Sequence, residues 1–225
     1  MCAGLMVEDK LIDVGFGVLT NLIRSGTMLD SINDVYISHT HSDHIGDFTG
    51  LVWAMAMENR TKRLKVVSSA GTASVLERVL ELQATPHSWL KFPIDFVRPE
   101  DVGVDYIKTL HDPETLAYRF RLDGRDFVYG ADTARSERVG QFAKGSDLLV
   151  HEATFLNGQE SIATITNHST SKDAGEAANL AKVSRLVLTH ISPTNHGSDE
   201  KYVAEAGKIF RGAIVVARDN LKVTL

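Results

Sequence analysis

Three histidines and an aspartate lie within six residues of this chain, directly after a short apolar run. Residues 38–47 read SHTHSDHIGD, and residues 34–37 before them have the pattern of a strand. Side chains two positions apart on an extended segment point the same way, so His39 and His41 can reach one ion. Asp43 and His44 follow, where a turn can present them to a second ion. Histidine and carboxylate side chains are ligands that zinc prefers, so a metal site is favoured over a polar loop whose histidines only form hydrogen bonds.

Three further metal-capable residues share this position at the end of a strand-like run. They are His111, Asp132 and His190. The small residues Gly130 and Ala131 precede Asp132 and let the backbone approach closely. Each position alone is more typical of a loop cap. Together with the first cluster they complete the ligand set of a two-metal centre.

Size and composition indicate an ordinary globular protein with one domain over residues 1–225. Apolar residues make up 43% of the 225 residues and charged residues 24%. No apolar run approaches the roughly 20 residues that span a bilayer, so no membrane association is expected. The first residues lack the pattern of a signal peptide, and Cys2 is the only cysteine. Both observations favour a cytoplasmic protein. The net charge of −5 argues weakly against binding long nucleic acid by charge alone.

Strand-like and helix-like runs alternate along the chain in a mixed order, which favours an α/β sandwich over a purely parallel, doubly wound sheet. Helices are predicted over 16–24, 51–59, 72–83, 170–182 and 200–210, with Thr170 and Asp173 as a capping box. Strands are predicted over 5–7, 11–14, 35–37, 64–67, 104–110, 116–122, 126–129, 148–150, 186–188, 213–216 and 221–225. Asp123 and Gly124 predict a tight turn between two of these strands.

The run HTHSDH at residues 39–44 matches the H-x-H-x-D-H motif of the metallo-β-lactamase superfamily. Residues 151–155 (HEATF) and 167–170 (NHST) resemble the HEAT and HST motifs of its ribonuclease Z-like branch. Residues 188–193 (LTHISP) are similar to the last metal motif of that branch. The resemblance covers nearly the whole chain and implies a four-layer αββα sandwich.

The resemblance also implies the ligands of two divalent metal ions. One ion is expected to be held by His39, His41 and His111, and the other by Asp43, His44 and His190, with Asp132 between them. Ligand chemistry without cysteine favours zinc and leaves manganese and iron open.

Two residues outside the ligand set have expected catalytic roles beside Asp43, which is placed to accept a proton from water. His168, in the HST-like segment, can meet a phosphoryl oxygen or protonate a leaving group. Glu152, in the HEAT-like segment, can orient His168. The alternatives are a helix-capping role for His168 and a strand-end salt bridge for Glu152. His87, His151 and His196 are expected to be structural or surface residues.

The chain departs from the ribonuclease Z pattern in two places. About twenty residues separate His111 from Asp132, enough for two strands and a turn, so the arm that grips transfer RNA is expected to be absent. The glycine-rich first strand of the branch is also expected to be missing. That would leave a sheet edge that can pair with a second chain, so a homodimer is expected.

These observations favour a dinuclear metal-dependent phosphodiesterase that resembles ribonuclease Z. Its substrate is expected to be an RNA 3′ end or a small or cyclic phosphodiester. A hydrolase of a lactone, a sulfate ester or a β-lactam on the same metal pair is an alternative. A non-catalytic metal- or RNA-binding module is a third interpretation, because a fold alone does not fix a function.

Overall fold

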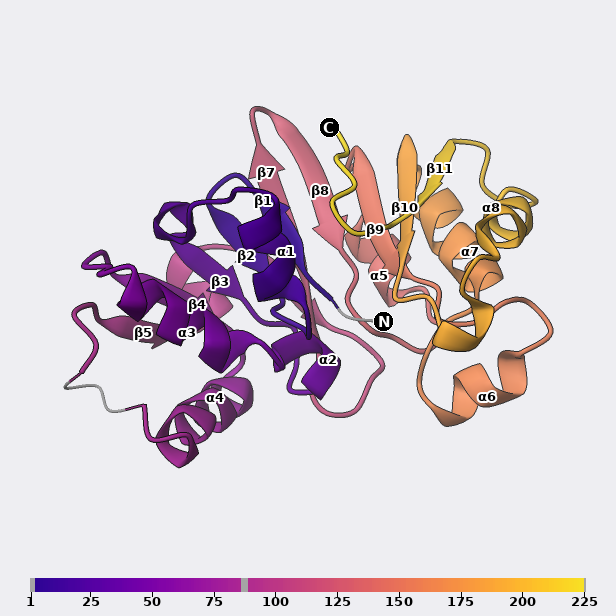
Figure 1. Ribbon diagram of the computed structural model, residues 1–225. Helices are drawn as coiled ribbons and strands as arrows, with labels where there is room; N and C mark the ends of the chain where they lie inside the picture. Colours follow the sequence, from indigo (N-terminus) through magenta and orange to yellow (C-terminus); the bar gives the residue numbers. More distant parts are fainter. Residues whose placement is uncertain (1–2, 86–88, 225) are drawn as a thin grey trace. The chain divides into compact units, whose positions relative to one another are not determined.

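The computed structural model describes residues 3–85 and 89–224 (Figure 1). Cys2 and His87, considered above, lie outside the described residues. The chain divides into two compact units, one ending at Gly103 and the other beginning at Val104. Within the described ranges, no helix has the length and apolar character needed to cross a bilayer.

The first unit is built on a five-stranded sheet with the strand order β1-β2-β3-β4-β5. The strands are β1 (Leu5–Val7), β2 (Lys10–Ile12), β3 (Asp34–Tyr36), β4 (Leu64–Val67) and β5 (Ile94–Val97). Only the β1–β2 pair is antiparallel, and the other neighbours are parallel. The carboxyl ends of β2 to β5 therefore meet at one edge of the sheet, where α/β proteins place their ligand sites.

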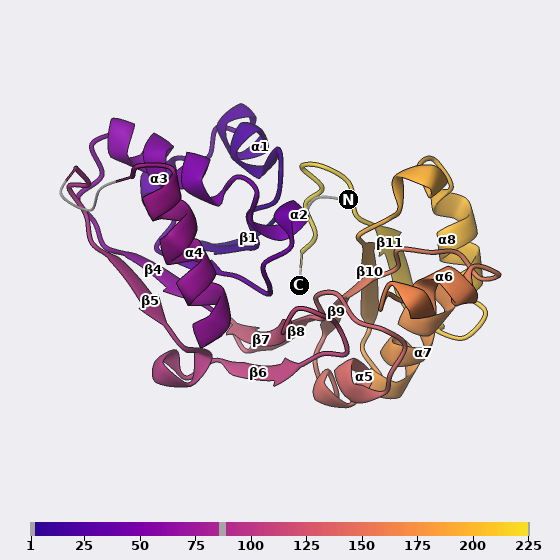
Figure 2. The same ribbon diagram turned by 90° about the horizontal axis from the view of Figure 1, so that it is seen from below.

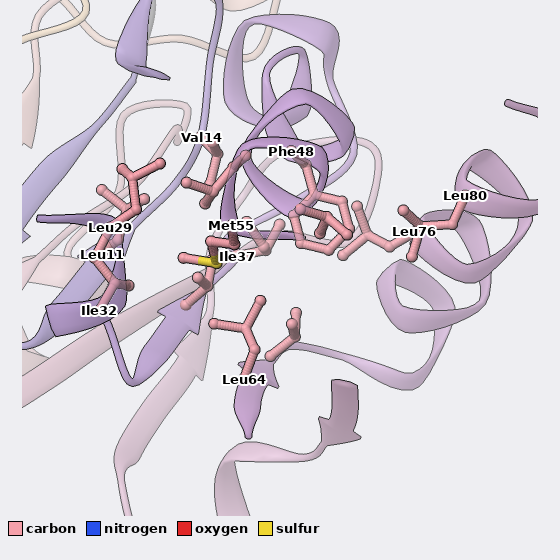
Figure 3. Packing of buried hydrophobic residues seen from close by; sticks show 14 of the residues in the cluster. Leu11, Val14, Leu29, Ile32, Ile37, Phe48, Met55, Leu64, Leu76 and Leu80 are labelled. Atoms are coloured by element: carbon pink, nitrogen blue, oxygen red, sulfur yellow. The ribbon is translucent and has the colours of Figure 1, made fainter. Parts of the chain in front are cut away.

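Helices of the first unit cover this sheet through a continuous apolar core. They are α1 (Val18–Arg24), α2 (Ser42–Ile45), α3 (Phe48–Met57) and α4 (Ala70–Leu82), with short 3₁₀ turns η1 (Leu29–Ser31) and η2 (Pro99–Val102). Phe48 and Met55 of α3 and Leu76 of α4 are fully buried in this core (Figure 3). Ser69 caps α4 by accepting a hydrogen bond from the Thr72 N–H.

The second unit is built on a six-stranded sheet with the order β11-β10-β9-β8-β7-β6. The strands are β6 (Asp105–Lys108), β7 (Leu116–Leu122), β8 (Arg125–Tyr129), β9 (Leu148–Glu152), β10 (Arg185–Thr189) and β11 (Ala213–Val216). Strands β8 to β11 run parallel, so their carboxyl ends share one edge. The turn predicted at Asp123 and Gly124 joins β7 to β8, and both residues have the positive φ that such a turn requires.

Small residues let the helices of the second unit pack closely. The helices are α5 (Arg138–Phe142), α6 (Glu160–Ile165), α7 (Ser171–Ala181) and α8 (Asp199–Ala206), with a 3₁₀ turn η3 (Pro193–Asn195). Figure 2 shows α5, α7 and α8 along the sheet formed by β9, β10 and β11. Buried alanines of α7 face this core, and the capping box of Thr170 and Asp173 starts the helix as predicted.

Several predicted boundaries differ from the structure for local reasons. The strand over 11–14 stops at Ile12, because Asp13 has a φ of 56°. The helix expected from residue 16 starts at Val18, after Gly17 with a φ of 86°. The strand predicted over 221–225 is wrong for its described part, since 221–224 form no strand after Asn220 turns with a φ of 60°. Strand β5 and helices α2, α5 and α6 were not predicted.

Candidate metal centre

The first unit gathers four of the seven expected ligands after the carboxyl end of β3. His39 and His41 lie on the extended segment before α2, and Asp43 and His44 lie within α2. The His39 Nε2 and His41 Nδ1 atoms are 3.1 Å apart, close to the roughly 3.3 Å between two nitrogens on one tetrahedral zinc ion. The rings of His39 and His44 have centroids 4.1 Å apart, and both side chains are fully buried. These short distances and this burial are typical of a metal site rather than of histidines in a surface loop.

Asp13 holds His44 in place and was not predicted to belong to the site. Its Oδ2 atom lies 2.8 Å from His44 Nδ1, and its Oδ1 atom accepts a hydrogen bond from the Ser38 N–H at 2.7 Å. The Ser38 hydroxyl donates to Asp13 Oδ2 and lies 3.0 Å from His39 Nδ1. A carboxylate that accepts from Nδ1 fixes the tautomer of the imidazole and directs Nε2 toward an ion.

Asp13 is a fully buried carboxylate. Burial alone raises the pKa of Asp13, but the charge and hydrogen bond of His44, together with the Ser38 N–H, hold that pKa below its ordinary value. The one sequence signal for Asp13 was its place at the end of β2, at the same sheet edge as the end of β3.

The second unit gathers the other three at the carboxyl ends of its own strands. Asp132 follows β8, and His190 follows β10. The Oδ2 atom of Asp132 lies 3.4 Å from His190 Nε2 and 4.0 Å from His111 Nε2. All three side chains are at most 5% exposed. These separations suit a carboxylate oxygen that shares a cation with each imidazole.

Backbone geometry places these residues. The Thr109 hydroxyl donates to the Asp132 carbonyl at 2.7 Å, which joins the end of β6 to the loop after β8. Ala131 and His190 adopt φ values of 51° and 60°, in the left-handed region. Non-glycine residues occupy this region mainly where surrounding contacts enforce it, and such positions gather at functional sites.

Glu152 is buried at the end of β9 and connects several loops of the second unit. It accepts hydrogen bonds from the backbone N–H groups of Thr133, Thr154 and Ser169 at 2.9, 3.2 and 3.0 Å. Its Oε1 atom also lies 2.8 Å from His168 Nδ1. The carboxylate is therefore an acceptor for three loops and one imidazole, which is more than a strand-end salt bridge provides.

Thr154 extends this network to a metal-capable histidine. The Thr154 hydroxyl donates to Glu152 Oε2 at 2.7 Å, so it accepts from His190 Nδ1, which lies 2.8 Å away. His111 Nδ1 donates in turn to the Asn167 carbonyl at 2.8 Å. In His111, His168 and His190 alike, Nδ1 has an oxygen partner, which fixes the ring orientation and makes Nε2 the nitrogen suited to an ion or a substrate.

His168 lies beside these ligands in the second unit. Its ring centroid is 4.9 Å from that of His111 and 5.1 Å from that of His190. One ligand atom each from Asp132, His168 and His190 lies within 4.8 Å of the others. His168 can therefore act on a group bound beside the metal ligands. His151 instead donates to the Glu152 carbonyl at 2.6 Å, and His196 is exposed.

Comparisons with known proteins support these observations. A family model described as a β-lactamase superfamily domain matches residues 10–191. The chain is 27% identical over 271 aligned positions to a ribonuclease Z of Haloarcula marismortui, covering 94% of this chain and 86% of that protein. It is 28% identical to a ribonuclease Z of Thermoplasma acidophilum over 84% of this chain and 80% of the relative. The first alignment is longer than this chain, so that relative contains segments absent here.

Solved structures show the same fold. The metallo-β-lactamase fold protein YhfI from Bacillus subtilis superposes with a TM-score of 0.79 and 24% identity, over 94% of this chain and 85% of that chain. The short form of human tRNase Z has a TM-score of 0.78 and 21% identity, over 98% and 90%. The predicted fold class, an α/β fold of the metallo-β-lactamase type, is confirmed, and so is the resemblance to the ribonuclease Z-like branch. This fold implies divalent metal ions.

Proposed function

The chain belongs to the family of β-lactamase superfamily domains, and from that premise we propose that it is a metal-dependent phosphodiesterase of the ribonuclease Z type. The relatives named ribonuclease Z support this proposal. The observation that carries it is the contact of Glu152 with His168, which presents an oriented imidazole beside Asp132 and His190.

We propose that the ligand sets of both units serve one metal pair within a single domain. His39, His41 and His111 would hold one ion, and Asp43, His44 and His190 the other, with Asp132 shared. The matched family region, residues 10–191, contains every one of these ligands. When bound, two divalent ions neutralise phosphoryl oxygens and generate a nucleophile from water at neutral pH. The donor set of imidazoles and carboxylates favours zinc over manganese or iron.

The protein's own groups then act around the phosphodiester. Asp43 accepts the proton of the attacking water. His168, held at Nδ1 by Glu152, donates from Nε2 to a phosphoryl or leaving oxygen. Thr154 and Asn167 bind Nδ1 of His190 and His111, respectively. These contacts keep both histidines in the tautomer whose Nε2 would bind the metal ion.

The substrate class comprises RNA 3′ ends and small or cyclic phosphodiesters. About twenty residues separate His111 from Asp132, and β7 and β8 occupy most of them, which leaves no room there for a substrate-gripping arm.

A cytoplasmic location, which the single cysteine favours, is part of the proposal. So is a homodimer, supported by β1, which ends its sheet and pairs only with β2 within it. A pure monomer in light scattering would exclude the homodimer.

The test is hydrolysis of bis(p-nitrophenyl) phosphate by the protein loaded with zinc or manganese. Asp132→Ala removes the shared metal ligand and His168→Ala removes a catalytic donor, so each variant should lose at least about a hundredfold in kcat. His196→Ala, which changes an exposed histidine, should match the wild type. Circular dichroism checks that each variant is folded. An inactive wild type in both metals would contradict the proposal and direct attention to lactones and sulfate esters.

A further inference from the structure

The segment between Glu152 and His168 is fixed against the ligands of the second unit. The His168 N–H donates to the Ala163 carbonyl at 2.8 Å, at the end of α6. The carbonyl of Asn167, the residue directly before His168, accepts from His111 Nδ1 at 2.8 Å. The Phe155 ring stands edge-on to the His168 ring, with centroids 6.3 Å apart. Thr154, at the start of the segment, accepts from His190 Nδ1 at 2.8 Å, so both ends of the segment contact residues of the candidate metal centre.

The same segment presents apolar side chains to solvent. Ile165 is 81% exposed and lies three residues before His168, and Ile162, one helical turn earlier, is 48% exposed. Leu110, directly before His111, is 40% exposed. Single exposed apolar residues are common, but here they flank the two histidines that the turn at Asn167 joins.

The segment lacks the positive charge that a surface binding a nucleic-acid backbone needs. Between Phe155 and Asn167 the sequence contains one charged residue, Glu160, and no lysine or arginine. Phosphate chains are bound by cationic side chains, so this segment is unsuited to a long backbone. An uncharged aromatic group, which gains by leaving water and has faces that apolar side chains can cover, is suited to it.

Resting on the proposed function, we propose that Leu110, Phe155, Ile162 and Ile165 form a rim, the α6 rim, that binds the nucleobase of a small phosphodiester substrate. The α6 rim contacts the organic group on the nonleaving side of the phosphorus. The phosphate itself is bound at the proposed metal centre. It gives the enzyme a preference for nucleoside diesters over alkyl diesters.

The test compares two substrates with the same leaving group: the p-nitrophenyl ester of thymidine 5′-monophosphate and methyl p-nitrophenyl phosphate. The wild type should prefer the nucleoside diester in kcat/KM. In the double variant Ile162→Ser, Ile165→Ser this preference should fall about tenfold, mainly through KM, because apolar contacts of this size discriminate by that order. Ile23→Ser changes an isoleucine of the first unit that is 58% exposed, and it should retain the full preference.

A binding measurement separates failure of the rim from failure of the proposed function. Calorimetry with thymidine 5′-monophosphate and methyl phosphate needs no turnover, and the wild type should bind the nucleotide more tightly than the double variant does. If neither diester is hydrolysed but this difference is present, the proposed function fails and the rim stands. The rim would be overturned if the double variant lost kcat/KM equally on both substrates, or if the wild type did not prefer the nucleotide. It would also be overturned if the double variant changed its oligomeric state but kept the wild-type substrate preference.

Discussion

Glu152 accepts a hydrogen bond from His168 Nδ1 at 2.8 Å, although the two residues are 16 positions apart in the chain. The carboxylate is 1% exposed and also accepts from three backbone N–H groups. Its charge and both of its oxygens are therefore used to fix one imidazole and the loops around it. A buried acceptor with this many donors does not tolerate an amide in its place.

Replacing Glu152 by glutamine should lower kcat by about ten- to a hundredfold, the usual effect of losing a partner that orients a catalytic or metal-binding histidine. The amide NH₂ would face at least one buried N–H, and His168 would lose its anionic partner. The measurement is kcat and KM on bis(p-nitrophenyl) phosphate, with bound metal determined in parallel. Glu160→Gln alters an exposed carboxylate of α6 and should leave kcat unchanged. Wild-type kcat in Glu152→Gln would exclude the orienting role.

Asp13→Asn should weaken metal binding by about ten- to a hundredfold, because the amide cannot accept from His44 and Ser38 as the carboxylate does. The measurement is zinc affinity by competition with a chromophoric chelator. Asp9→Asn is the matched control, since Asp9 lies at the surface of the same unit and pairs with Lys10 and Asn33. Equal zinc affinity in Asp13→Asn and the wild type would show that His44 does not depend on Asp13.

The candidate ligands lie in local patterns that a sequence can reveal, whereas Asp13 was missed because its partners are distant in the chain. His39 and His41 share one side of an extended segment, which a period of two residues predicts. Asp13 meets Ser38 and His44 only because β2 and β3 are parallel neighbours, 25 and 31 positions apart in the chain at these contacts. No local pattern encodes that pairing.

The same distinction applies to the fold. The capping box at Thr170 and the turn at Asp123 were predicted, since each depends on neighbouring residues. Left-handed backbone at Asp13 and His190 could not be predicted, because tertiary contacts impose it on residues that rarely choose it. The short helix α6 was also missed, since its six residues carry too little periodicity.

Gly175→Ala should destabilise the protein by about 1–3 kcal/mol, the usual result of overpacking a core. A Cβ atom at this position of α7 would lie 2.8 Å from the Ala206 carbonyl oxygen and 3.0 Å from its Cα, so backbone would have to move. Gly71→Ala provides the contrast, because its nearest atom would be Ser69 Oγ at 3.9 Å.

The Gly71 variant should gain about 0.5–1 kcal/mol from the lower entropy of its unfolded chain. Urea unfolding of both variants measures the difference. A neutral Gly175→Ala would mean that α7 and α8 are less closely packed than the structure indicates.

Tyr202 predicts how stability responds to alkaline pH. Its side chain is fully buried in α8, and burial raises the pKa of Tyr202 to about 12. Between pH 10 and 12 the folded protein keeps the phenol proton that the unfolded chain releases, so the free energy of unfolding should fall as pH rises through this window. Tyr202→Phe should reduce that slope.

The same variant removes the hydrogen bond that the Tyr202 hydroxyl donates to the Thr154 carbonyl at 3.2 Å, so it should also lose about 1 kcal/mol at pH 8. Urea unfolding at several pH values measures both effects. Below pH 9 the difference between the two proteins should be constant, because neither folded nor unfolded phenol ionises there. The slope that remains above pH 10 is expected from Tyr36, whose pKa burial also raises to about 12. An unchanged slope in Tyr202→Phe would show that Tyr202 does not contribute to the alkaline loss of stability.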